Sequence, residues 1–288
     1  MTIKDRARKQ LSRMAGPPRL AMREFLDHRA MLRIPAESVY VNRLRPTNSH
    51  EIHGLLKSKS AEAAWRVDEE QLAKVNPPDY ASGVNPGDQR ALYSLVHALR
   101  PERILEVGTH IGSSTLAMAL ACRRSASNVI SPTILSVDIR DVNDEKTKPW
   151  AYFGSDASPH EKLRQLALDG LVEFQVGDSV KVLSEQETCF DFVFLDGSHR
   201  APAVYREIPA AIRALAPGGL VVMHDVFPDG QALWPGSRPG AGPWQAASRL
   251  VSDNPALRLI PLGELPWPTK YGGRLTSLAV LSRVSEEL

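Results

Sequence analysis

The sequence has 288 residues, of which 43% are hydrophobic and 24% charged, and its formal net charge at pH 7 is +2. A chain of this length and composition can bury a full hydrophobic core. The near balance of charges gives no case for a specific nucleic-acid partner, and no apolar stretch is long enough for a transmembrane helix. The N-terminus lacks the apolar segment of a signal peptide, and Cys122 and Cys189 lie in apolar surroundings that favour reduced, buried thiols. We therefore expect a soluble, cytoplasmic protein.

The first 23 residues are strongly basic, with a single acid, Asp5. A membrane-surface helix, an organelle address and an arm for an anionic partner would all have this composition. We prefer an ordinary amphipathic helix with a solvated basic face, because Ile3, Ala7, Leu11 and Met14 share one side of it. The two prolines at 17–18 are predicted to break this helix.

Residues 1–87 are predicted to form a helical N-terminal extension, and residues 88–288 the main domain. Prolines divide the extension into short pieces, with one longer helical stretch at about 49–75 and a loop at 76–88. A further helix is predicted at about 88–99. The extension could cap a binding site or contact another subunit, and we expect a homo-oligomer.

From residue 101 onward, predicted strands alternate with helices, which is typical of a parallel α/β sheet. The last two strands are joined without a clear helix, so we expect a mostly parallel, seven-stranded sheet with an antiparallel edge strand. The predicted strands are 103–108, 134–139, 171–176, 191–195, 220–225, 257–262 and 275–282, and the predicted helices between them are 113–122, 159–168, 203–215 and 243–253.

The segment "EVGTHIGSS" at 106–114 is predicted to be a strand end, a glycine turn and a helix start. Gly108 and Gly112 allow a close backbone approach to a ligand, and Ser113 or Ser114 can cap the helix. His110 stands where the middle glycine of a dinucleotide fingerprint would be, so a nucleoside without phosphates fits better. The alternative is a tight turn with a purely structural role.

Two further acidic residues follow predicted strands. Asp138 ends the second strand, where a carboxylate can accept hydrogen bonds from both hydroxyls of a ribose. Asp178 follows the third strand and could accept from an adenine amino group. Each has an ordinary structural alternative, which is a helix cap or loop acid for Asp138 and a Gly-Asp turn for Asp178.

Together, "ILEVGTHIGSSTLAMA", "SVDI", "QVGDS", "LDGSH" and "LAPGGLVVMHDV" resemble the class I S-adenosylmethionine (AdoMet)-dependent methyltransferases over residues 88–285. Within that class the chain is similar to the metal-dependent small-molecule O-methyltransferases, particularly the branch that modifies sugars of macrolide and aminocoumarin antibiotics. The resemblance implies a doubly wound, Rossmann-like fold and methyl transfer to a hydroxyl of a sugar or phenolic natural product. It also implies that the AdoMet-binding residues are Glu106, Gly108, Thr109, Gly112, Ser113, Ser114, Asp138, Asp178 and Ser179.

A metal site is predicted where the fourth and fifth strands end. Asp196 follows the fourth strand, and His224 and Asp225 follow the fifth, so adjacent strands would bring the three side chains together. Two carboxylates and one further donor are enough to hold a hydrated divalent cation. The resemblance implies magnesium with all three as ligands. His224 departs from the family, which more usually has Asp or Glu there, and an imidazole better suits manganese or another transition metal.

His199 lies three residues after Asp196 and is predicted to be the catalytic base. Methyl transfer from a sulfonium needs an alkoxide-like nucleophile, and a neutral imidazole can remove the hydroxyl proton near pH 7. The structural alternative is a histidine that packs or caps in a polar loop.

Two long segments are candidate walls of the site. The insertion at 140–160 carries Trp150, Tyr152 and Phe153, and could be a lid or a surface loop that packs its aromatic rings on the core. The second segment, 227–244, follows the fifth strand and could line the substrate. Two other functions remain open on this scaffold: a metal-dependent hydroxylase-like or hydrolytic enzyme, and a non-catalytic nucleoside-binding protein.

Overall fold

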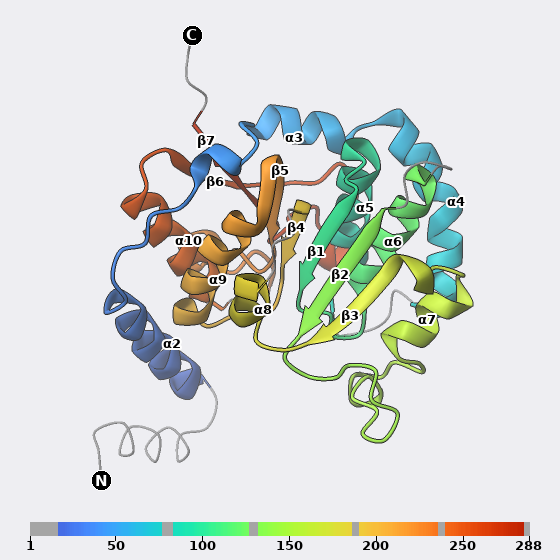
Figure 1. Ribbon diagram of the computed structural model, residues 1–288, viewed down its shortest axis with the longest axis horizontal. Helices are drawn as coiled ribbons and strands as arrows, with labels where there is room; N and C mark the ends of the chain where they lie inside the picture. The colour runs from blue at the N-terminus through green and yellow to red at the C-terminus, as the bar shows by residue number, and fades with distance from the viewer. Residues whose placement is uncertain (1–16, 77–82, 127–131, 186–189, 236–239, 285–288) are drawn as a thin grey trace.

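The computed structural model describes residues 17–76, 83–126, 132–185, 190–235 and 240–284. Seven strands form one sheet in the order β3-β2-β1-β4-β5-β7-β6 (Figure 1). The strands are β1 (Arg103–Val107), β2 (Thr133–Asp138), β3 (Val172–Val176), β4 (Phe190–Leu195), β5 (Leu215–Met223), β6 (Leu257–Pro261) and β7 (Ala279–Arg283).

The strand directions confirm the predicted fold class. The pairs β1–β2, β1–β4, β2–β3 and β4–β5 are parallel. The reversed strand is β7, which pairs in an antiparallel manner with β5 and with the edge strand β6. The order reverses between β1 and β4, and in an open α/β sheet such a switch point opens a crevice at the carboxyl ends of the strands.

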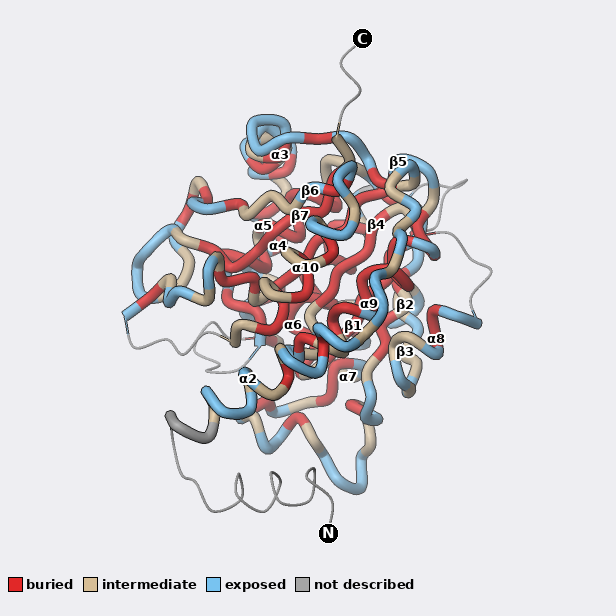
Figure 2. The backbone as a smooth tube through the Cα atoms, turned by 90° about the vertical axis from the view of Figure 1, so that its left-hand side faces the viewer, coloured by how far each residue is buried: buried red, intermediate tan, exposed pale blue. Residues whose placement is uncertain are grey.

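Helices cover both faces of the sheet, and the burial pattern of β4 shows why. Phe192 and Phe194 enter the core beneath one helical layer, and Val193 and Leu195 enter the core beneath the other. Both faces are therefore apolar, as expected for a central parallel strand. The buried backbone is concentrated in the middle of the molecule (Figure 2).

One helical layer contains α3 (Ser49–Leu56), α4 (Lys59–Val75), α5 (Pro86–Leu99), α6 (Ser113–Ser125) and α7 (Pro159–Gln165). The predicted helix at 49–75 is thus two helices, because Ser58 caps the start of α4 with its side chain. Residues of α3 and α4 share one hydrophobic core with α5 and α6. The domain boundary at 87/88 stays a prediction.

The opposite layer contains α2 (Pro17–Leu32), α8 (Ser179–Glu185), α9 (Ala201–Ala214) and α10 (Gly242–Asp253). The prolines at 17–18 stand in the first turn of α2, where a helix tolerates proline. The helix predicted before them lies outside the described residues. An ion pair of 2.7 Å between Asp27 and Arg200 ties α2 to the start of α9.

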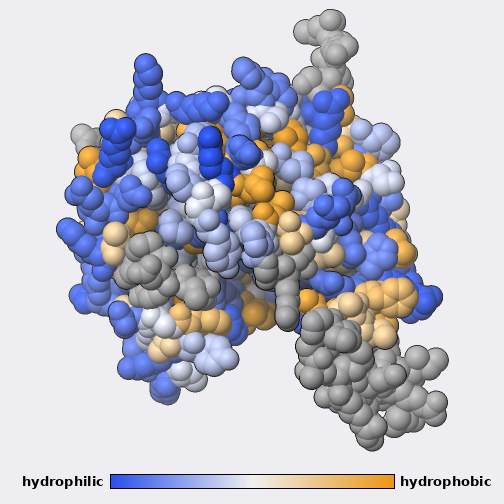
Figure 3. All heavy atoms as spheres, turned by 180° about the vertical axis from the view of Figure 1, so that it is seen from behind, coloured by the Kyte–Doolittle hydropathy of each residue, from blue (hydrophilic) through white to orange (hydrophobic). Residues whose placement is uncertain are grey.

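Short 3-10 helices complete the chain as η1 (Val41–Arg43), η2 (Ala151–Phe153), η3 (Asp169–Leu171), η4 (Pro228–Gly230) and η5 (Lys270–Gly272). The face seen in Figure 3 is mostly hydrophilic, with apolar atoms in separate patches. In the part of the chain that the structure describes, no helix combines the length and the apolar character needed to cross a membrane. Cys122 is buried with a free thiol, whereas Cys189 lies outside the described residues.

Candidate functional site

A cavity of about 900 Å³ lies at the carboxyl ends of the central strands. Its lining joins the predicted cofactor side, at β1, β2 and β3, to the predicted metal side, at β4 and β5. Of the predicted site residues, it is lined by Gly108, Asp138, Asp178, Ser179, Asp196, His199, His224 and Asp225. The structure therefore brings most of the predicted site into one space.

Gly108 shapes the floor of this cavity. Its φ of +96° lies in the left-handed region, and a Cβ there would overlap with the backbone oxygen of Asp196. The amide of Asp196 in turn donates to the carbonyl of Val107, at 2.8 Å. Only glycine lets the ends of β1 and β4 approach this closely, and that approach places Asp196 beside the cofactor half of the cavity.

Asp138 faces the cavity at the end of β2. Its two carboxylate oxygens accept hydrogen bonds from the amides of His110, at 3.1 Å, and Arg140, at 3.0 Å. These donors fix the carboxylate while leaving lone pairs for a ligand. His110 itself has a φ of +52°, and its ring packs edge-on against Phe153, with centroids 4.2 Å apart. The histidine thus occupies the left-handed position at which a glycine would have been expected.

Glu106 is not among the residues that line the cavity, and its predicted cofactor contact stays a prediction. Its carboxyl group is fully buried and accepts from the hydroxyls of Ser114, Thr115 and Ser136, each at 2.5 Å. Thr109 joins the same network through Ser136. Burial raises the pKa of Glu106 to about 7, although the hydroxyl hydrogen bonds oppose this shift.

The start of α6 likewise packs on protein rather than on the cavity. Its N-cap is Gly112, which has no side-chain cap, so the predicted capping by Ser113 or Ser114 is not found. A Cβ at Gly112 would press on Pro159, and the hydroxyl of Ser113 donates to Asn76, at 3.4 Å. Gly112 and Ser113 thus contact other residues of the protein, and their role in binding the cofactor stays a prediction.

Asp196, His199 and Asp225 form a cluster of possible metal ligands. One donor atom of each lies within 4.8 Å of the others. The Nε2 atom of His199 is 3.1 Å from Asp225 and 3.9 Å from Asp196. Asp225 has a φ of +53°, a strained conformation of the kind that often marks functional sites. A set of two carboxylates and an imidazole fits a divalent cation.

His224 lies beneath this cluster and is only 6% exposed. Its Nδ1 atom is 3.2 Å from Asp196 and 3.4 Å from Asp225, while Nε2 is 3.1 Å from Asp88. Burial lowers the pKa of His224, but the negative charges of Asp196 and Asp225 outweigh it and hold the pKa well above 6.5. Asp88 was not predicted, because it lies far away in sequence, in the first turn of α5.

His199 is also surrounded by negative charge. Hydrogen bonds to Asp196 and Asp225 raise its pKa to about 10, against the opposing effect of burial. For Asp196 and Asp225, burial raises the pKa, but the charge of His224 and the hydrogen bonds from His199 lower it overall. This negative charge favours the protonated imidazole when no further cation is present, and the role of His199 as a base stays a prediction.

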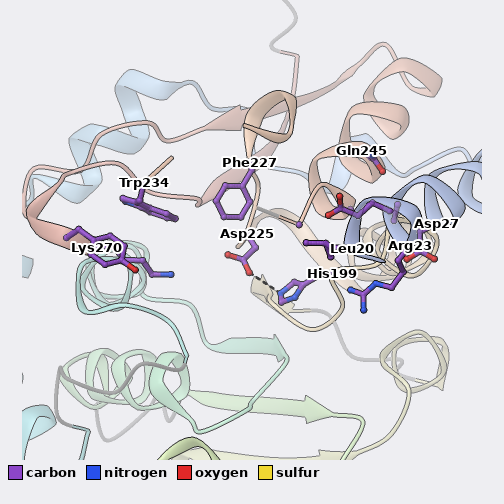
Figure 4. A pocket seen from close by; sticks show the side chains of 14 residues that line it. Leu20, Arg23, Asp27, His199, Asp225, Phe227, Trp234, Gln245 and Lys270 are labelled. Carbon is purple, nitrogen blue, oxygen red and sulfur yellow. Dashed lines mark ion pairs between the residues drawn. The ribbon is translucent and has the colours of Figure 1, made fainter. Parts of the chain in front are cut away.

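A second cavity of about 410 Å³ meets the first at His199 and Asp225 (Figure 4). Figure 4 shows these two side chains at the centre, with aromatic rings on one side and α2 on the other. Its lining includes Phe227 and Trp234, so the segment at 227–244 supplies a wall of the site. Arg23, Asp27 and Lys270 were missed, since they come from α2 and η5, remote in sequence from the strand tips.

Of the insertion at 140–160, Arg140 lines the larger cavity. Trp150 is buried, whereas Tyr152 is 86% exposed. Phe153 contacts His110, a residue of the cavity wall. Phe153 thus supports the cavity wall through His110, as a lid residue could, whereas Trp150 is buried, as in a surface loop that packs on the core.

Residues 105–226 match a protein family described as a methyltransferase domain. The O-methyltransferase TomG from Streptomyces achromogenes, involved in tomaymycin synthesis and solved with AdoMet, superposes with a TM-score of 0.50 at 18% identity, covering 83% of this chain and 97% of its own. The cofactor-bound MTB protein Rv0187 superposes with a TM-score of 0.51 at 19% identity, covering 84% and 100%. The chain therefore has the Rossmann-like fold of these proteins, and its central segment matches a methyltransferase domain.

Proposed function

We propose that this protein transfers the methyl group of AdoMet to a hydroxyl of a small molecule, either a sugar or a phenolic natural product, with the help of a divalent metal and His199. The observation that carries the proposal is the single cavity of about 900 Å³, in which residues predicted to bind the cofactor adjoin the cluster of Asp196, His199 and Asp225. A methyl donor and an acceptor hydroxyl can meet only where two such halves are joined.

The cofactor half offers acceptors at the positions where a nucleoside needs them. Asp138 suits the two ribose hydroxyls, and Asp178 and Ser179 line the adjoining wall. Glu207 of α9 is a further candidate that the sequence analysis missed. Its carboxyl group lines the cavity, accepts from Ser179 at 2.5 Å, and has a pKa that burial raises to about 7. A carboxyl poised to be neutral can both donate to and accept from an adenine edge.

The acceptor would enter through the smaller cavity. Phe227 and Trp234 lie with their ring centroids 5.9 Å apart at 87°, and Lys270 stands 4.9 Å from the ring of Trp234. Aromatic faces of this kind pack against the flat apolar surface of a phenol or the C–H face of a sugar. His199 and Asp225 form the boundary between the two cavities, so a hydroxyl that reaches them also faces the cofactor half.

The donor set supports a divalent metal at Asp196 and Asp225, with Nδ1 of His224 beside them. A metal bound there would stabilise the deprotonated acceptor oxygen and offset the carboxylate charge that raises the pKa of His199. His199 would then take the hydroxyl proton on Nε2, and the N–H so formed would donate to Asp225, whose carboxylate lies 3.1 Å from Nε2 in this structure.

Calorimetry and a radiolabelled methyl-transfer assay test this proposal. We expect AdoMet and S-adenosylhomocysteine to bind, and label to pass to members of a panel of catechols and deoxysugar glycosides. His199→Gln should reduce transfer at least about 100-fold while leaving AdoMet affinity unchanged. His160→Gln, on an exposed histidine of α7, serves as the matched control. Failure to bind AdoMet, or turnover of an acceptor without it, would contradict the proposal.

A further inference from the structure

A buried carboxylate holds the far side of His224. Asp88 is fully buried, and its Oδ2 lies 3.1 Å from Nε2 of His224. The hydroxyl of Thr276 donates to Oδ1 of Asp88, and the side-chain amide of Asn85 donates to Oδ2, each at 2.5 Å. The Thr276 oxygen is itself engaged by the amide of Leu278, so its proton is directed to Asp88. The carboxylate is therefore fixed and oriented on the imidazole.

This arrangement determines which nitrogen of His224 carries hydrogen. A carboxylate can only accept, so Nε2 must donate to Asp88. Nδ1 is left facing Asp196 at 3.2 Å and Asp225 at 3.4 Å. The ring cannot turn away, because it is buried and its edge packs near Phe194, with centroids 6.2 Å apart. Nδ1 and the two carboxylates thus face a common point, where either a proton on Nδ1 or a bound cation can offset the two negative charges.

The spacing of these atoms suits neighbouring ligands of one metal ion. Nitrogen and oxygen donors at about 2.1 Å from a metal lie about 3.0 to 3.4 Å from one another in octahedral or tetrahedral sites. The contacts of Nδ1 with Asp196, at 3.2 Å, and with Asp225, at 3.4 Å, fall in that range. A histidine whose other nitrogen donates to a carboxylate is the usual form of a metal-bound histidine.

We infer that Asp88 is a positioning residue that holds His224 as an Nδ1 metal ligand, and that the site thereby takes a divalent transition metal such as Mn²⁺ in preference to Mg²⁺. The inference rests on the metal site of the proposed function. Imidazole nitrogen binds first-row transition metals well and Mg²⁺ poorly, so the nitrogen at this position sets the preference. Asp88 acts through His224 and does not itself touch the metal.

Metal binding can be measured directly, without an acceptor. In the full-length protein we expect Mn²⁺ to bind at least about tenfold more tightly than Mg²⁺, as followed by EPR with Mg²⁺ competition. Asp88→Asn should weaken Mn²⁺ binding by about 10- to 100-fold. His224→Asp should remove the preference for Mn²⁺. Asp68→Asn is the matched control, since Asp68 is equally buried but pairs with Arg123 and Arg124 away from the site.

Pulsed EPR supplies a second readout that a merely structural role of Asp88 would not change. In a His199→Gln background, Mn²⁺ should show coupling to one imidazole nitrogen, which His224→Asp removes and Asp88→Asn weakens. If Asp88→Asn proves unstable, Thr276→Val is the second variant to test. It removes a hydrogen-bond donor to Asp88 without altering the charge of Asp88, and it should also weaken Mn²⁺ binding. Circular dichroism of each variant separates loss of metal from loss of fold.

Three results would overturn the inference. The first is Mg²⁺ binding as tight as Mn²⁺ binding, and the second is bound Mn²⁺ without nitrogen coupling in the His199→Gln background. The third is no Mn²⁺ binding up to about 1 mM, which would mean that Nδ1 of His224 carries a proton instead of binding a metal. AdoMet calorimetry on the same samples reports separately on the proposed function. Loss of AdoMet binding with an intact Mn²⁺ site would contradict the proposed function and leave the role of Asp88 standing.

Discussion

The Nε2 atom of His199 lies 3.1 Å from Oδ2 of Asp225, and this pair forms the boundary between the two cavities. The two residues reach it from different elements. His199 follows β4, where its backbone packs so closely on Gly242 of α10 that a Cβ at Gly242 would overlap with the carbonyl of His199. Asp225 follows β5 in a left-handed conformation. The pair is thus placed by backbone packing as well as by charge.

Asp225→Asn should reduce methyl transfer at least about 100-fold, because the variant loses a charge that supports both the cation and His199. The Kd for AdoMet should change by less than about threefold, since Asp225 lies at the acceptor side of the cavity. Asp229→Asn is a matched control, because Asp229 has a similar φ of +54° but is exposed outside both cavities. Equal transfer rates for the Asp225→Asn variant and the wild type would count against the proposed role.

Gly108→Ala should destabilise the protein by about 3 kcal/mol or more, which combines left-handed backbone strain with a steric overlap on Asp196. Gly154→Ala separates the two effects, because Gly154 has a φ of +79° with nothing within 4 Å of the position that the new methyl group would take. That control should cost about 1 kcal/mol. Urea unfolding of both variants gives the difference, and similar values for the two would show that the close approach at Gly108 is relaxed easily.

Asp138→Ala should raise the Kd for AdoMet about 10- to 100-fold, since a hydrogen bond to a charged group is worth about 1.5–3 kcal/mol. Asp141→Ala is the control, because Asp141 is exposed and accepts from the amide of Asn143 in a similar loop turn, at 2.9 Å. Calorimetry at constant ionic strength measures both. An unchanged Kd for Asp138→Ala would remove Asp138 from the cofactor site.

The central half of the fold could be predicted from sequence because its signals are local. Uninterrupted apolar runs such as 192–195 are typical of strands buried on both faces, and polar residues directly after them mark the carboxyl ends of strands. This logic located Asp138, Asp196 and Asp225 correctly at the cavity.

The remaining site residues could not be predicted because they depend on tertiary packing. Asp88 is separated from His224 by 136 residues, and nothing in the first turn of α5 indicates that its carboxylate faces an imidazole. Glu106 shows the opposite limitation. Its position at the end of β1 resembles a ligand position, yet three hydroxyls from β2 and α6 enclose it. Sequence position indicates the end of a strand, whereas the neighbours decide which way a side chain points.

Glu106 should make the stability of the protein depend on pH. Its pKa is about 7 in the folded state against 4.5 for the ordinary group, so the folded protein binds more protons between these values. The contribution of Glu106 to the free energy of unfolding is therefore fully present below about pH 4.5 and is lost as the pH rises through 7. We expect this group to lower the free energy of unfolding by about 2–3 kcal/mol between pH 5 and pH 7.5.

Glu106→Gln should remove that part of the pH dependence, because an amide does not ionise and the surrounding hydroxyls can rotate to satisfy it. Urea unfolding at several pH values measures the change. Glu207, whose pKa is also raised to about 7 by burial, remains in the variant, so a shallower slope of the same sign should persist. Glu161→Gln is the control, since hydrogen bonds from Arg164 lower the pKa of this partly exposed carboxylate to about 2, so that its effect on stability falls below pH 4.5. An unaltered slope in Glu106→Gln would mean that the three hydroxyls stabilise the ionised carboxylate enough to cancel the effect of burial.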